Sequence, residues 1–186
     1  MKKCLRFLVV MAAIFLLQVV PGNSYAYTYG GSEYQLVLGG ISWGDANAAA
    51  VGSGWHLAVI TSAAENAAVY NNLVLPAGGI DYWGYWIGGY QNPITEPVAT
   101  NGWTWVTGEP WSYTNWNAFE PNDFYGPGSE QVLEMIIGNG KWNDGGDWIA
   151  GYIAERSAVP EPTTMLLIGS GLIGLAGYGR KKLFKK

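Results

Sequence analysis

The segment from Trp83 to Trp148 most constrains the fold, because its apolar residues occur only in brief runs. It is rich in Gly, Trp, Tyr, Asn and Pro. The runs in it and just beyond it, each of strand length, are residues 85–87, 103–106, 132–137 and 151–154. Residues 107–130 contain no convincing regular element. A loop of that length in a compact domain is expected to be functional, or to be held by something other than secondary structure. The segment therefore predicts short strands joined by long loops.

Residues 34–73, which precede this segment, predict two short helices between strands. The expected elements are strands at residues 34–38 and 56–60, a helix within 42–51 and a helix from 63 to about 73. Gly52 and Gly54 end the first, alanine-rich helix. Ser62 and Glu65 have capping-box spacing, in which Ser62 caps a backbone N–H and Glu65 reaches back to Ser62. Helices and strands together predict an α+β domain.

Charge is unevenly distributed along the 186 residues. Residues 27–160 carry two basic and thirteen acidic side chains, a net charge of −11, whereas the whole chain has −4. Such an acidic module repels phosphate backbones, so we expect no nucleic-acid partner, and metal cations or basic surfaces are favoured. Cys4 is the one cysteine and His56 the one histidine. The folded region therefore has no disulfide or zinc–thiolate site, and a Ser-His-Asp triad has little support.

Both ends of the chain carry targeting features. Residues 1–26 have a basic start, an apolar run and small residues before Ala26, which predicts a signal peptide cleaved there. Residues 159–186 combine a Val-Pro-Glu-Pro motif, an apolar segment and a basic tail. The apolar segment is at the short limit for crossing a bilayer, and the tail should stay cytoplasmic, which places residues 27–158 outside. A permanent single-span anchor and a segment removed by processing both stay open.

Oxygen-bearing side chains in and after the long loop form the main candidate site. They are Glu120, Asn122, Glu130, Asn143 and Asp144. Carboxylate and amide oxygens are the ligands that Ca²⁺ requires. Glu120 and Asn122 flank a proline and would present two oxygens from one rigid turn, while Asn143 and Asp144 would close the site from a second segment. The alternative is a set of turn residues that cap their own backbone.

The order of motifs over residues 34–155 resembles the C-type lectin-like domain. The matching pieces are GWHLAVITS at 54–62, EN at 65–66, WIGG at 86–89, WTW at 103–105, GE at 108–109, NW at 115–116, EPN at 120–122, WND at 142–144 and GYIA at 151–154. The resemblance implies two helices flanking small antiparallel sheets, with a long loop region that bears the ligand.

The resemblance also implies a ligand. In sugar-binding members, residues at the five candidate positions coordinate one Ca²⁺ and hydrogen-bond two neighbouring sugar hydroxyls. The Glu-Pro-Asn order resembles the mannose-type subset, and Pro121 matches a proline that is cis in the family. The interval from Glu120 to Glu130 is about two residues longer than in mannose binders, with Phe124 and Tyr125 inserted. These two rings, together with Trp111 and Tyr113, either stack on sugar faces or pack under the loop.

The chain departs from the family pattern at its cysteines and at a second calcium site. The four core cysteines of the family fall at Ala50 with Ala154 and at Val132 with Asp147. At the second site Asp123 persists, whereas Gln131 stands where an acid is usual. The core must compensate for the missing disulfides, or calcium must help to hold the loop.

The C-terminal segment resembles the PEP-CTERM sorting signal of Gram-negative bacteria. This implies processing by an exosortase-type membrane protease, transient contact with the inner membrane, and a final place at the cell surface or in the extracellular matrix near polysaccharide. We therefore expect a calcium-dependent carbohydrate- or polysaccharide-binding module that is not an enzyme. The alternatives are a lectin-like module that binds protein or is structural in the matrix and, with less support, a glycoside hydrolase using Glu120 and Glu130.

Overall fold

The computed structural model describes residues 24–78, 84–146 and 149–158. Within these ranges the strands form one sheet in the order β1-β2-β8-β4-β6-β7, with β3 added to β8 and β5 added to β4. The strands are β1 (Ser24–Tyr29), β2 (Ser32–Ile41), β3 (His56–Leu57), β4 (Gly84–Gln91), β5 (Trp103–Trp105), β6 (Val132–Ile136), β7 (Trp142–Gly145) and β8 (Ile149–Ser157). Neighbours are antiparallel except β4 and β8, which pair in parallel. The expected α+β class is confirmed.

The N-terminal hairpin of β1 and β2 extends the predicted strand at residues 34–38 in both directions. We did not predict β1, which pairs with β2 from Ser24 onward. The predicted cleavage point after Ala26 therefore falls inside β1. The rest of the predicted signal peptide, residues 1–23, and nearly all of the C-terminal signal lie outside the described residues. In the part of the chain that is described, no helix is long and apolar enough to cross a membrane.

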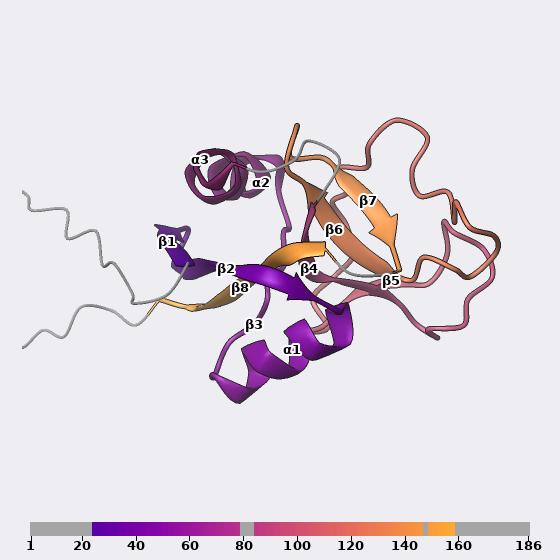
Figure 1. Ribbon diagram of the computed structural model, residues 1–186, viewed down its shortest axis with the longest axis horizontal. Helices are drawn as coiled ribbons and strands as arrows, with labels where there is room; N and C mark the ends of the chain where they lie inside the picture. The colour runs from indigo at the N-terminus through magenta and orange to yellow at the C-terminus, as the bar shows by residue number, and fades with distance from the viewer. Residues whose placement is uncertain (1–23, 79–83, 147–148, 159–186) are drawn as a thin grey trace, which may run out of the picture.

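The two predicted helices lie on opposite sides of the central strands (Figure 1). Helix α1 (Trp43–Gly52) begins at Ser42, whose hydroxyl accepts the backbone N–H of Asp45. Helix α2 (Ala63–Val69) begins at Ser62 and continues through a π-helical turn, η1 (Tyr70–Val74), into α3 (Leu75–Ala77). Both helices are confirmed, and the second extends beyond the predicted end at residue 73.

Two details predicted for residues 56–65 are wrong. Glu65 does not reach back to Ser62; its carboxylate accepts the backbone N–H and the hydroxyl of Thr61, one residue further upstream. Of the predicted strand at residues 56–60, only His56 and Leu57 pair with β8, since the chain then leaves the ladder. Residues 57–60 are nevertheless buried as predicted.

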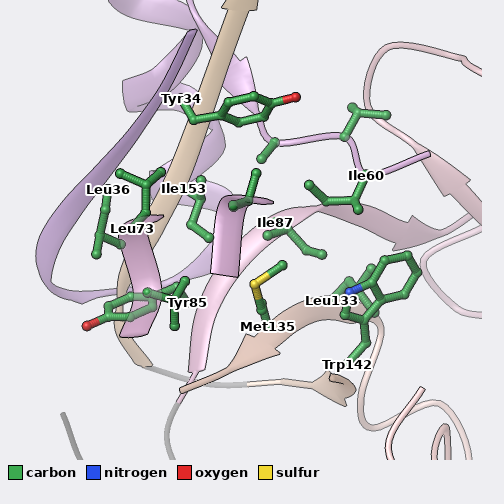
Figure 2. Packing of buried hydrophobic residues seen from close by; sticks show 14 of the residues in the cluster. Tyr34, Leu36, Ile60, Leu73, Tyr85, Ile87, Leu133, Met135, Trp142 and Ile153 are labelled. Atoms are coloured by element: carbon green, nitrogen blue, oxygen red, sulfur yellow. The ribbon is translucent and has the colours of Figure 1, made fainter. Parts of the chain in front are cut away.

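The core fills the space between the sheet and the two helices without a disulfide. Figure 2 shows Met135 of β6 near Ile87 of β4 and Leu133, with Trp142 at the loop end of this group. Ala50, Ala154 and Val132 stand where the family has cysteines, and all three are buried in one apolar cluster. Asp147, at the fourth cysteine position, lies outside the described residues.

The long loops gather at one end of the molecule, beyond β5 and β7 and away from α2 (Figure 1). Residues 107–130 contain no helix, and their one ladder contact is an isolated bridge between Trp116 and Trp142, as expected for a loop. The loop after β4 is held by Gln91, whose fully buried amide nitrogen donates to the carbonyls of Val98, Ala99 and Asn101. Hydrogen bonds and packing, rather than ladders, therefore fix this region.

Candidate functional site

Asp144 of β7 joins the two chain segments that contain the predicted site. Its carboxylate is fully buried and accepts backbone N–H groups from the opposite loop: from Asn122 at 3.0 and 3.1 Å and from Asp123 at 2.9 Å. The Glu120–Pro121 peptide bond is cis, as the family resemblance implies. Asp144 thereby holds the Glu-Pro-Asn turn against the end of the sheet.

Asp123 holds the far end of the same loop. Its carboxylate accepts the N–H groups of Gly128 at 2.9 Å and Glu130 at 3.0 Å. Glu130 in turn is buried, and its Oε2 accepts the N–H of Phe124 at 2.6 Å. These bonds close residues 123–130 into a compact turn. Glu130 therefore faces the Glu-Pro-Asn turn despite the two inserted residues.

The four charged or amide groups of the site lie close together, although their exposure differs. Glu120 is half-buried, and the charges of Asp144 and Glu130 act on it. Asn143 is half-buried beside Asp144 on β7, whereas the Asn122 side chain is exposed at the rim. The structure thus brings together Glu120, Glu130, Asn143 and Asp144, with Asn122 attached through its backbone. No hydrogen bond joins the side chain of Asn122 to the other four residues of the site.

Sequence reasoning missed a fourth acid of the site, Glu134 of β6. It lies directly opposite Asn143 in the β6–β7 register, and its Oε1 accepts the Asn143 side-chain N–H at 2.9 Å. Only 7 % of Glu134 is exposed. The available signal was a single acid within the apolar run at residues 132–137. A two-residue strand period gives the face on which this acid lies, whereas its partner Asn143 follows only from the strand register.

Burial and neighbouring acids raise the pKa values of Glu120 and Glu134. Burial, and then the charge of Asp144, raises the pKa of Glu120 to about 7. Burial also raises the pKa of Glu134 to about 7, against the hydrogen bond from Asn143, and the charges of Glu130 and Asp144 add to the increase. Acids at such a site are costly to ionise unless a cation compensates their charge.

Two carboxylate oxygens of this cluster are buried without a hydrogen-bond partner within the described residues: Oε2 of Glu120 and Oε2 of Glu134. Glu130, Glu134 and Asn143 also line a cavity of about 200 Å³, whose other walls include Trp86, Tyr125 and Ile149. Of the two acids with an unpartnered oxygen, Glu134 lines this cavity and Glu120 does not. Carboxylate oxygens of this kind are ligands that a hard divalent ion takes. The residues present therefore fit Ca²⁺ in charge and ligand type.

The side chains are not, however, already arranged as a metal cluster. Across residues 24–78, 84–146 and 149–158, no group of three or more Asp, Glu, His or Cys side chains is placed so that it could hold a metal ion. The Asp144 carboxylate already accepts two backbone N–H groups. A bound ion would have to draw these side chains closer together.

The candidate sugar-stacking aromatics separate into two pairs. Trp111 packs against Trp105 and Trp103, and Tyr113 stacks edge-on against Trp142, so this pair belongs to the core. Phe124 and Tyr125 are 76 % and 78 % exposed and contact each other edge-on beside the cavity. Only the inserted pair is therefore available to a ligand.

Comparison with known proteins identifies the C-terminal segment. Residues 158–181 match the family model described as the PEP-CTERM protein-sorting motif. A curated relative, human C-type lectin domain family 4 member G, is 34 % identical over 61 residues, which are 33 % of this chain and 19 % of that protein. The chain thus matches less than a fifth of the length of this relative.

Solved structures identify the fold of the described region. The cow C-type carbohydrate-recognition domain of CD23, crystallised in the presence of GlcNAc2Man3 oligosaccharide, has a TM-score of 0.58 at 27 % identity and covers 73 % of this chain and 95 % of its own. A calcium-independent type II antifreeze protein has a TM-score of 0.57 at 26 % identity, covering 72 % and 92 %. The chain is therefore a protein with a C-type lectin-like fold that ends in a PEP-CTERM sorting motif.

Proposed function

We propose that this protein is a calcium-dependent carbohydrate-binding module with a mannose-type site, displayed at the cell surface or in the extracellular matrix. The observation that carries the proposal is the largely buried acidic cluster of Glu120, Glu130, Glu134 and Asp144 at the loop end, in which two carboxylate oxygens have no hydrogen-bond partner among the described residues. A binding protein gains from such a cluster only if a cation compensates it.

The proposed ligands are the residues expected from the sequence: Glu120, Asn122, Glu130, Asn143 and Asp144. Calcium would supply coordination positions for two neighbouring sugar hydroxyls. Glu120 and Glu130 would accept the protons of these hydroxyls in hydrogen bonds, and the exposed Asn122 amide would donate to an oxygen lone pair. The Glu-Pro-Asn order favours vicinal equatorial diols, as in mannose, and the related CD23 domain was crystallised with a mannose-containing oligosaccharide.

The sorting motif supports a place outside the cell. We propose that the protein is exported through its N-terminal signal and contacts the inner membrane through its C-terminal segment. An exosortase-type protease would then remove that segment. Display of many copies would compensate for the weak affinity of a single sugar site. Extracellular polysaccharide is the proposed ligand.

A second candidate is a lectin-like module that binds protein or serves structurally, without calcium. The similarity to a calcium-independent antifreeze protein favours it, as does the absence of a ready metal cluster among the described side chains. Neither candidate is an enzyme. The CD23 domain is named a carbohydrate-recognition domain and the curated relative a C-type lectin, and no catalytic role is proposed for Glu120 and Glu130.

Calcium and mannose titrations of the purified protein, followed by tryptophan fluorescence and thermal melting, separate the candidates. Trp142 lies in the same β7 strand as Asn143 and Asp144, so changes at the site should alter the emission. A calcium-dependent rise in Tm followed by a sugar response supports the first candidate. The absence of any calcium response refutes it, and a calcium response without any sugar response favours the second.

A further inference from the structure

The orientation of the Asn143 side chain is fixed by two acceptor atoms. Its Nδ2 donates to Glu134 Oε1 at 2.9 Å and to the backbone carbonyl of Asp144 at 2.7 Å. An amide nitrogen has two hydrogens, so these two contacts use both of them. Because both partners are acceptors, the nitrogen and not the oxygen must face them. Asn143 Oδ1 is therefore the atom left for a cation.

Glu134 is the side chain that determines the orientation of the Asn143 amide. The Asp144 carbonyl is fixed in the backbone of β7, whereas the Glu134 carboxylate reaches Asn143 from the neighbouring strand. Without Glu134, Asn143 would keep one anchor and could rotate about its terminal bond. A cation requires the oxygen of an asparagine, so an amide that samples both orientations presents the wrong atom part of the time.

The surroundings of Glu134 leave room for a carboxylate and little else. A Cβ added at Gly84 of β4 would lie 2.5 Å from Glu134 Oε2, so glycine at this position provides the space that the carboxylate occupies. The same Oε2 is buried and, among the described residues, has no hydrogen-bond partner. An unpartnered buried carboxylate lowers stability, so stability alone does not account for Glu134.

We propose that Glu134 is a positioning residue that holds the Asn143 amide so that its oxygen faces the bound cation. The inference rests on the proposed calcium site and adds to it a residue that does not itself touch the ion.

The test compares calcium affinities of Glu134→Ala and Glu134→Gln by isothermal titration calorimetry, with Glu109→Ala as the matched control at an exposed acid. Alanine should raise Kd by about 10- to 100-fold, as is typical for the loss of an outer-shell partner. Glutamine keeps an acceptor oxygen for Asn143 and should recover most of the affinity. A Kd for alanine within twofold of the wild type overturns the proposal. Equal losses for alanine and glutamine also overturn it, since charge rather than orientation would then matter.

A second readout does not depend on calcium. The Asn143 side-chain amide resonances of the metal-free protein, assigned by their loss in Asn143→Asp, should move strongly in Glu134→Ala and little in Glu134→Gln. If alanine does not fold, Glu134→Val suits a strand and replaces it. If the wild type binds no calcium, the proposed function fails, and these resonances alone decide whether Glu134 holds Asn143. Unmoved resonances overturn the inference.

Discussion

Replacing Glu134 with glutamine should stabilise the metal-free protein at neutral pH and leave it nearly unchanged in mild acid. The folded state raises the pKa of Glu134 from 4.5 to about 7, chiefly through burial. A raised carboxyl pKa contributes stability that is complete below the unfolded value and is lost as pH rises through the folded value. The wild type should therefore lose stability between pH 4.5 and 7.

The size of the loss follows from the pKa difference. One pKa unit corresponds to about 1.4 kcal/mol, so the change from 4.5 to about 7 amounts to roughly 3 kcal/mol in the free energy of unfolding. Because Glu134 is buried, solvent screening reduces this little. Glutamine has no charge to bury, so its advantage over glutamate should grow from near zero at pH 4.5 to roughly 3 kcal/mol at pH 8.

Urea unfolding in the presence of EDTA measures this difference at pH 4.5, 6 and 8, with Glu109→Gln as the charge-matched control. Any fixed cost of the new amide appears equally at each pH and cancels. A difference between glutamine and wild type that does not change with pH would refute the reasoning.

Three further substitutions test other parts of the site. Asn143→Ala should abolish the calcium-dependent rise in Tm and cost about 1–2 kcal/mol without metal, because Glu134 loses the hydrogen bond from Asn143; an unchanged calcium response would contradict its role as a ligand. Gln91→Ala should cost about 2 kcal/mol in urea unfolding, because the Asn101 carbonyl loses its donor and the carbonyls of Val98 and Ala99 each lose one of two; a loss below about 1 kcal/mol would show that the loop is held otherwise. Phe124→Ala with Tyr125→Ala should leave Tm nearly unchanged, since both rings are exposed, and weaken sugar binding up to about tenfold in glycan titrations; Phe119→Ala is the exposed control, and equal effects would argue against stacking.

Local signals in the sequence predicted the helices and most strands. Ser42 and Ser62 mark the helix starts because a hydroxyl can satisfy a free backbone N–H whatever the rest of the fold does. Short apolar runs likewise marked β4, β5, β6 and β8. These signals lie within a few residues of the structure that they specify, so they can be read without tertiary information.

The missed features all depend on a partner in another strand. The residues of β7, Trp-Asn-Asp-Gly, have little strand propensity, and they form a strand because β6 pairs with them. Strand β1 exists through its hairpin with β2. The role of Glu134 depends on its hydrogen bond with Asn143 in the neighbouring strand. The order of motifs gave the five candidate ligands, whereas the residue that orients one of them could be found only from the register.

The loop is held in place by the protein itself, and this bears on what calcium would do. Asp144 fixes the Glu-Pro-Asn turn, Asp123 closes residues 123–130, and Gln91 holds the loop after β4. These contacts all join protein atoms, and Ala50 and Ala154 are buried in one apolar cluster where the family has a disulfide. The chain itself therefore holds the loop, and a bound calcium ion would add to these contacts. Calcium would mainly neutralise Glu120 and its neighbours, so little ordering entropy would oppose its binding.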